Sequence, residues 1–391
     1  MAGRHDQHTV SSHRAIKVTR ILAIADSDSY LKWSAATLAA LPADFEPTQL
    51  VVASPLTPSS AQIHAAGAAD APVVGVSGLL SVVKQQKPDV VLLAATGPVV
   101  AVLARRLVAA APRLRPVMVT GMPGISFPPS RRAVELRRGC DLLLVHSRRE
   151  YRAYAEIVAD VAPWLTVGLA RLPFLGSPRR EWDRGSGDVV FAAQAKVPAT
   201  RDHRRAVLSA LAAIEPGVAV VKLRAGSGEA QTHRERLPYE ELWQEMVAEG
   251  VATSGRVRFT RAPMAEALAS ARACVTVSST AALEAMAAGV DVLIVDDFGV
   301  SADMINFVFE GSGCLGSLDD VSAGRFRQPT TAWLQDNYLH SRQESDWLDR
   351  LGGLLRQRAE GRMLQHPAAR VGGRAAAVRR RLRLHLIARR R

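Results

Sequence analysis

Short apolar runs alternate with alanine-rich stretches of helical spacing, and this rhythm occurs twice along the chain. In the first half the candidate strands are Arg20–Ala25, Leu50–Ala53, Val90–Ala94, Val117–Thr120 and Leu142–Val145. The intervening candidate helices are Tyr30–Leu41, Val99–Ala111 and Arg148–Val158. These strands are continuously apolar, as expected for parallel strands that are covered on both faces. The pattern predicts a doubly wound α/β domain over residues 18–172.

A proline- and glycine-punctuated segment, residues 173–187, follows and predicts a linker. The rhythm then restarts over residues 188–325. Its candidate strands are Asp188–Ala192, Val218–Leu223, Arg256–Phe259, Cys274–Val277 and Val292–Val295. Its candidate helices are Arg204–Ile214, Tyr239–Ala248, Met264–Ala271 and Thr280–Ala288. We therefore expect a disordered stretch at 1–17, two Rossmann-like domains, C-terminal helices over 326–367 and a tail at 368–391.

The net charge of +13 is unevenly distributed over the 391 residues. Nine arginines and no acidic residue lie between residues 370 and 391, which leaves +4 for the rest. With only 5% aromatic residues as stacking platforms, this near-neutral body argues against nucleic-acid binding. The tail, which interleaves arginines with Leu382, Leu384, Leu386 and Ile387, either lies on an anionic membrane surface or is solvated.

Three widely separated cysteines, Cys140, Cys274 and Cys314, form no CxxC pair and favour a reducing compartment. The first residues contain no apolar core of a signal peptide, and no apolar run is long enough to span a membrane. We expect a cytoplasmic protein, with peripheral contact at the inner face of the plasma membrane if the tail binds lipid.

The most informative motif is the segment that starts at Val275 and ends at Gly289. A buried strand is followed by Ser278, Ser279 and Thr280, and then by an alanine-rich helix that contains Glu284. Hydroxyl groups at a helix start, together with its free N–H groups and positive dipole end, form an anion site. A serine- or threonine-capped strand–helix unit without a ligand remains the alternative.

This segment resembles the donor-binding domain of GT-B glycosyltransferases, in which a Ser/Thr-rich turn precedes a helix of the type E-A-M-A-x-G-x-P-V. Here the motif runs from Glu284 to Val292, with Asp291 in place of the usual proline. The Ser-Ser-Thr turn is similar to that of bacterial sialyltransferases, capsule-polymer transferases and related epimerases. Over about residues 18–320 the chain resembles an actinobacterial group of uncharacterised glycosyltransferases. The resemblance implies two Rossmann-like domains facing a cleft, a nucleotide-sugar substrate, and neither a metal nor a cofactor.

Several residues at other strand ends of the second domain are further candidates for the donor site. Lys222 and Arg224 stand where related transferases carry K-L-H-P, although Arg224 replaces the histidine; His233 is the alternative imidazole. Lys196, after the first strand of this domain, is either a phosphate ligand or a solvated lysine. Asp297 and Asn306 follow the last strand and are candidate sugar contacts.

The first strand of the first domain ends in Asp26 and Asp28, which are candidate general bases for an acceptor hydroxyl. A D-x-D pair also suggests a metal site, but a pair after the first strand does not match the GT-A arrangement. Capping of the next helix is the structural alternative for Asp28. His146 is a second base candidate, and Gly121 and Gly124 are candidate points of acceptor approach.

The combined prediction is a metal-independent glycosyltransferase that acts on an envelope or lipid-linked glycan acceptor. Two alternatives stay open. One is a nucleotide-sugar 2-epimerase, which needs no acceptor. The other is a non-catalytic scaffold protein that keeps the fold without the chemistry.

Overall fold

Seven parallel strands form the sheet of the first domain, in the order β3-β2-β1-β4-β5-β6-β7. The computed structural model describes residues 18–110, 115–175, 187–223, 235–364 and 366. The strands are β1 Thr19–Ala25, β2 Phe45–Val52, β3 Val73–Val74, β4 Val90–Ala94, β5 Val117–Gly121, β6 Leu142–Val145 and β7 Thr166–Leu169. The helices are α1 Asp28–Ala39, α2 Ser60–Ala65, α3 Val76–Gln86, α4 Gly97–Ala110, α5 Arg131–Arg137 and α6 Arg148–Val161.

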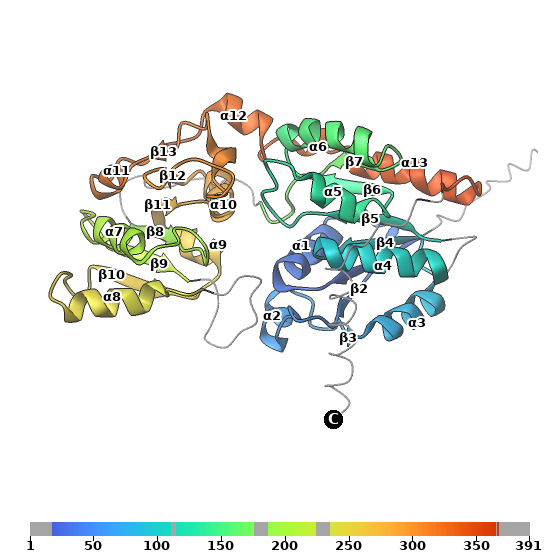
Figure 1. Cartoon of the computed structure of the whole chain (residues 1–391), viewed down its shortest axis with the longest axis horizontal. Coiled ribbons are helices and arrows are strands. Elements are labelled where there is room, and N and C mark those ends of the chain that lie inside the picture. Colours follow the sequence, from blue (N-terminus) through green and yellow to red (C-terminus); the bar gives the residue numbers. More distant parts are fainter. Residues whose placement is uncertain (1–17, 111–114, 176–186, 224–234, 365, 367–391) are drawn as a thin grey trace, which may run out of the picture.

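Six parallel strands form the second sheet, in the order β10-β9-β8-β11-β12-β13. They are β8 Asp188–Ala192, β9 Ala219–Lys222, β10 Val257–Thr260, β11 Ala271–Thr276, β12 Asp291–Val295 and β13 Leu315–Gly316. The helices are α7 Arg201–Ala212, α8 Tyr239–Ala248, α9 Met264–Ala267, α10 Ala281–Ala288 and α11 Leu318–Ser322. The two sheets stand side by side as separate lobes, each with helices on both faces (Figure 1). This is the predicted pair of doubly wound domains.

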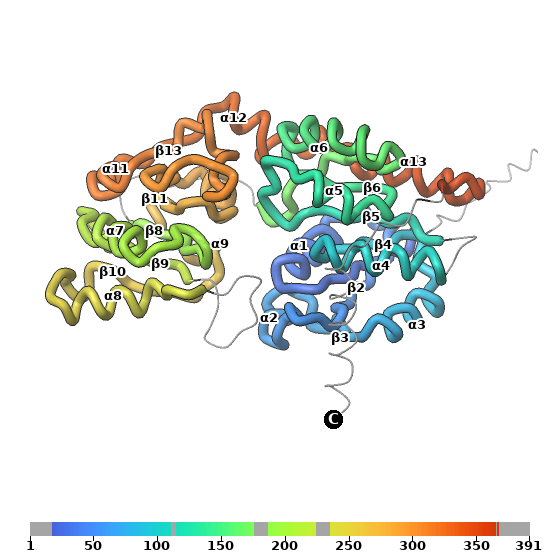
Figure 2. Tube along the Cα trace, in the orientation of Figure 1, coloured from blue at the N-terminus to red at the C-terminus, as the bar shows by residue number. Residues whose placement is uncertain are grey.

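After α11 the chain returns to the first domain, as the orange-to-red part of the tube shows (Figure 2). It passes through α12 Thr331–Asp336 and ends in α13 Trp347–Ala359. Trp347 and Leu351 of α13 are buried in the same apolar cluster as Ile21 and Val119 of the first sheet. Helix α13, in the predicted C-terminal helical segment 326–367, therefore packs on the first domain, whereas Trp333 and Tyr338 before it lie in the apolar cluster of β11 and β12.

Gly168 explains how α13 comes so close to the edge strand β7. A Cβ atom at this glycine would lie 3.1–3.2 Å from the Cβ and Cα atoms of Trp347. A glycine inside a strand often marks such a close approach. The sequence pattern did not predict β7, because Thr-Val-Gly-Leu is too short and too interrupted to stand out from a loop.

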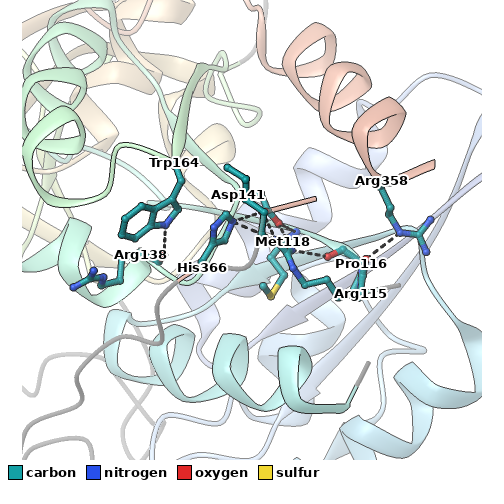
Figure 3. Close-up of polar contacts among 9 residues, drawn as sticks. Arg115, Pro116, Met118, Arg138, Asp141, Trp164, Arg358 and His366 are labelled. Atoms are coloured by element: carbon teal, nitrogen blue, oxygen red, sulfur yellow. Dashed lines mark hydrogen bonds and ion pairs between the residues drawn. The ribbon is translucent and has the colours of Figure 1, made fainter. Parts of the chain in front are cut away.

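A buried polar cluster holds the chain beyond α13 at the end of the first sheet where β5 and β6 begin (Figure 3). Arg115 makes two hydrogen bonds to the Asp141 carboxylate, at 2.7 and 2.8 Å, and one to the Leu364 carbonyl oxygen. The His366 ring contacts the same carboxylate and stacks on Trp164. Burial opposes the charge, but the bonds from Arg115 and His366 hold the pKa of Asp141 below its usual value.

Other differences from the predicted elements are local. The predicted helix Met264–Ala271 is one turn of α9 followed by a 3₁₀ turn, and Ala271 already belongs to β11. The short strands β3 and β13 were not predicted, because two-residue edge strands have no periodic pattern. Segments 1–17 and 368–391, and residues 176–186 of the predicted linker, lie outside the described residues. In the described part of the chain, no helix has the length and apolar character needed to cross a membrane.

Candidate active site

The strand-end loops of the two domains meet where the β5–α5 loop of the first reaches α10 of the second. A Cβ atom at Gly124 would lie only 2.8 Å from Cγ2 of Thr280, the residue before α10. Beside this contact the rings of Phe127 and Phe307 stack at 6.0 Å, one from each domain. Helices α1 and α10 lie on the facing sides of the two lobes (Figure 1). In parallel α/β sheets ligands bind beyond the carboxyl ends of the strands.

The three residues of the Ser-Ser-Thr turn differ in what they can offer to a ligand. Ser278 is only 4% exposed, and both its N–H and its hydroxyl donate to Oε1 of Gln194, at 2.8 Å each. Ser279 is partly exposed, and its hydroxyl accepts from the Ala281 N–H. Thr280 is also partly exposed, and its hydroxyl makes no capping bond to α10. Ser279 and Thr280, rather than Ser278, are therefore the residues of this turn that solvent reaches.

Glu284 lies one helical turn beyond Thr280, between cations from both domains. Burial raises the pKa of Glu284 to about 7, against the opposing fields of Lys222 in β9 and Lys32 in α1. Lys32 also forms an ion pair with Asp28, at 2.8 Å between Nζ and Oδ2. Glu284 thus lies near the predicted Lys222 and near Lys32, which was not predicted. Lys32 connects Glu284 to the predicted Asp28.

The remaining candidates of the second domain are either exposed or outside the described residues. Lys196 is exposed in the β8–α7 loop. Arg224 and His233 lie outside the described residues. Asp297 is exposed, and its carboxylate accepts a hydrogen bond from the Leu318 N–H.

The two aspartates after β1 have different environments. Asp26 is 1% exposed, and its Oδ2 accepts from the N–H and hydroxyl of Thr96, at 2.9 and 2.6 Å. Burial raises the pKa of Asp26 above its usual value, although the Thr96 bonds oppose this. The Asp28 side chain is 25% exposed in the first turn of α1. Asp28 is therefore the better placed of the two to meet an acceptor.

His146, predicted as an alternative base, has a structural environment instead. Its Nδ1 faces the Ala170 carbonyl oxygen at 2.8 Å, and its Nε2 accepts from the Trp33 indole N–H at 3.0 Å. Burial lowers the pKa of His146, which favours the neutral ring. Because the histidine is 1% exposed and both ring nitrogens are engaged, this geometry leaves none to accept a proton from an acceptor.

Gly121 and Asn306 are also committed to internal contacts. A Cβ atom at Gly121 would lie 2.7 Å from the buried Trp33 ring, so this glycine makes room for tryptophan rather than for an acceptor. The Asn306 carboxamide is fully buried, accepts from the Ser301 N–H and donates to the Gly299 carbonyl oxygen, both at 3.0 Å. These two bonds close the loop from Gly299 to Asn306.

Two features of the site could not be found by motif. The sequence marks Lys32 only by its position four residues after Asp28, a spacing that allows an ion pair on one face of α1. Gln194 occurs in a loop with no recognisable motif. Only its hydrogen bonds to Ser278 in the structure identify it. In the described part of the chain, no three His, Cys, Asp or Glu side chains come together as metal ligands would.

A cavity of about 290 Å³ lies elsewhere, between α6, β7 and the start of α13. Its charged lining residues Arg148, Arg152 and Asp346 are each already paired, with Glu344, Asp336 and Arg350 respectively. The cavity is therefore lined by the contacts that hold the C-terminal segment to the first domain, and the candidate site stays at the facing strand ends.

Comparison with solved structures supports the two-domain architecture. S. aureus MnaA in complex with UDP superposes with a TM-score of 0.54 at 12% identity, covering 90% of this chain and 99% of that one. UDP-GlcNAc 2-epimerase from Neisseria meningitidis, bound to UDP-GlcNAc, has a TM-score of 0.52 at 9% identity, covering 94% and 100%. A UDP-glucosyltransferase from Polygonum tinctorium has a TM-score of 0.51 at 11% identity, covering 92% and 98%. At these identities the likeness concerns the fold.

No curated protein matches this chain. The family model described as "Putative glycosyltransferase (DUF6716)" matches residues 21–354, which include nearly all of both sheets and most of α13. The predicted GT-B architecture is confirmed, and the chain belongs to this glycosyltransferase family.

Proposed function

We propose that this protein transfers a sugar, without a metal ion, from a nucleotide-activated donor to an envelope or lipid-linked glycan acceptor. One observation carries the proposal. The turn suited to a donor's phosphates, Ser279–Thr280, lies against the first domain's loops at the Gly124–Thr280 contact. Such an arrangement allows a donor held by the second domain to meet an acceptor held by the first.

The second domain supplies the groups for the donor. The partly exposed residues Ser279 and Thr280 stand at the positive end of the α10 dipole, which favours phosphate oxygens. Lys222 ends β9, Lys196 lies in the loop after the neighbouring strand β8, and both can offset the charge of the departing nucleotide. Two of the similar solved structures contain UDP or UDP-GlcNAc, which supports a nucleotide sugar as the substrate class here.

The first domain supplies the base. In the proposed step, the Asp28 carboxylate accepts the proton of an acceptor hydroxyl, and the oxygen forms a bond to the anomeric carbon. The bond from that carbon to the nucleotide's phosphate oxygen breaks, and the nucleotide leaves with the electron pair. The exposure of Asp28, in contrast to the burial of Asp26 and His146, supports this choice.

The part of the proposal that concerns a lipid-linked acceptor comes from the arginine-rich tail. That tail, residues 368–391, lies outside the described residues and its membrane contact stays a prediction from sequence. Each basic residue near an anionic surface is worth about 1 kcal/mol. Co-sedimentation with anionic vesicles, comparing the full chain with one ending at Gln365, tests this contact; equal binding would exclude it.

Product analysis by NMR and mass spectrometry tests the catalytic proposal. The full chain is incubated with a panel of nucleotide sugars, with and without glycan acceptors. We expect acceptor-dependent release of the nucleotide. Conversion of the donor sugar without any acceptor would replace the proposal by an epimerase, and nucleotide binding without any conversion would replace it by a scaffold.

Asp28→Asn is the variant that tests the base. General-base catalysis contributes about 10²–10⁴-fold, so transfer should fall by that factor while nucleotide affinity is retained. Asp44→Asn, at an exposed position after α1, is the matched control. Unchanged turnover in the Asp28→Asn variant would remove Asp28 from the mechanism.

A further inference from the structure

Gln194, directly beyond β8, is oriented by the turn that it touches. Its Oε1 accepts hydrogen bonds from both the N–H and the hydroxyl of Ser278, at 2.8 Å each. A backbone N–H can only donate, so the atom that faces Ser278 must be the amide oxygen. The Nε2 group of the same carboxamide is therefore directed away from Ser278.

A buried arginine fixes the backbone of this residue from behind. Arg204 is 1% exposed, and its guanidinium donates to the carbonyl oxygens of Gln194 and Ala195, both at 3.0 Å. The same guanidinium donates to the Pro198 carbonyl oxygen at 2.9 Å and lies over the Tyr239 ring. With its main chain and its side-chain oxygen both held, Gln194 has little freedom to turn its carboxamide around.

The two Nε2–H donors are left for another partner. In the described part of the chain, Nε2 of Gln194 has no hydrogen-bond partner, and the side chain is only half-buried. The carboxamide lies at the ends of β8 and β11, next to the turn that carries Ser279 and Thr280. A fixed pair of N–H donors at this place suits an acceptor-only group such as a phosphate oxygen.

We propose that Gln194 is a donor-binding residue whose amide NH₂ group donates to the phosphate oxygens of the nucleotide sugar. The inference rests on the proposed function, because it assumes that the donor's phosphates lie at the Ser279–Thr280 turn. It goes beyond holding the turn in place, a role that needs only the oxygen of the side chain. The two roles predict opposite results for one substitution.

Gln194→Glu separates them, because a carboxylate of the same shape still accepts both bonds from Ser278. The second carboxylate oxygen then replaces the NH₂ group and repels phosphate. We expect nucleotide affinity to fall by about 10- to 150-fold, the range for hydrogen bonds to charged groups. The thermal midpoint without nucleotide should stay that of the wild type.

The experiment is a calorimetric titration of the full chain with CMP, CDP, UDP and GDP, repeated with the tightest binder on the variants. Gln357→Glu, at an exposed position in α13, adds the same charge away from the site and serves as the control. Gln194→Ala should also lose affinity, with some loss of stability because Ser278 loses its acceptor. If the wild type binds and Gln194→Glu binds equally well, Gln194 only positions the turn and the inference is overturned. If the wild type binds no nucleotide, the proposed function fails and the inference fails with it.

Discussion

The two domains share a topology but use their strand ends differently. In the first domain the polar groups beyond β1 and β6, Asp26 and His146, are buried and hydrogen-bonded to Thr96, Trp33 and Ala170. In the second domain, Ser279 and Thr280 beyond β11 are partly exposed. A polar residue at a strand end is therefore not by itself a ligand. Substitutions of Asp26 or His146 should therefore change stability, and substitutions of Ser279 or Thr280 should change nucleotide binding.

The largest expected effect is on stability, at Glu150 in α6. Its fully buried carboxylate accepts from the Ser126 N–H at 2.7 Å, the His146 N–H at 2.9 Å and the Tyr338 hydroxyl. These groups belong to the β5–α5 loop, the end of β6 and the returning C-terminal segment. Glu150→Ala leaves these three donors without a partner, two of them on the buried residues His146 and Tyr338, so we expect a loss of about 3–5 kcal/mol in the free energy of unfolding.

Chemical denaturation of the two variants Glu150→Ala and Glu156→Ala measures this effect. Glu156 is exposed on the same helix, and its replacement should change stability by less than about 0.5 kcal/mol. Equal stability of both variants would show that the buried network at Glu150 does not hold the first domain's strand ends, and the contrast between the domains would lose its basis.

A smaller effect is expected at Gly124, where the two domains touch. Gly124→Ala places a Cβ atom 2.8 Å from Cγ2 of Thr280, and overpacking of this kind costs about 1–3 kcal/mol. We expect weaker nucleotide binding, because Thr280, which the new Cβ atom displaces, belongs to the Ser279–Thr280 turn. Thr280→Ser removes Cγ2 and keeps the hydroxyl, so the double variant should recover.

A double-mutant cycle on nucleotide affinity gives the coupling between these two positions. Additive losses, with no recovery in the double variant, would mean that Gly124 and Thr280 do not meet when the nucleotide is bound.

The smallest expected effect is a pH dependence at Glu284. Its pKa is raised by burial from the ordinary 4.5 to about 7, so the folded protein takes up a proton that the unfolded chain does not. Stability should therefore be greatest at low pH and decline as pH rises from about 4.5 through 7. The contribution should be about 1 kcal/mol once screening by solvent is included.

The difference in thermal midpoint between the wild type and Glu284→Gln, followed from pH 5 to 8.5, isolates this group. The wild type should lose stability relative to the variant as pH rises. Glu266→Gln, at an exposed position, should follow the wild type across the whole range. If the difference in thermal midpoint between the wild type and Glu284→Gln stays constant, Glu284 does not titrate between pH 5 and 8.5.

The sequence predicted the fold well because parallel buried strands are long apolar runs with a strong pattern, as in β1, β4 and β6. It failed for β3 and β13, whose two residues carry no periodicity. It also failed for the docking of α13 on β5–β7, which depends on a glycine in one strand meeting a tryptophan some 180 positions later.

For the site, the strand-end rule directed attention to the Ser-Ser-Thr turn and to the loop after β1. It cannot distinguish Asp26 from Asp28, because burial depends on partners such as Thr96 that lie 70 positions away. Lys32 and Gln194 were missed for the same reason: their significance comes from neighbours in space.

In the proposed mechanism the donor's phosphates lie at the Ser279–Thr280 turn of the second domain. A crystal structure of the full chain with the nucleotide that binds best in calorimetry tests it most directly. We predict phosphate oxygens within hydrogen-bond distance of Ser279 and Thr280, with the Gln194 NH₂ group beside them. A nucleotide whose phosphates lie away from α10, or at the strand ends of the first domain, would contradict the account.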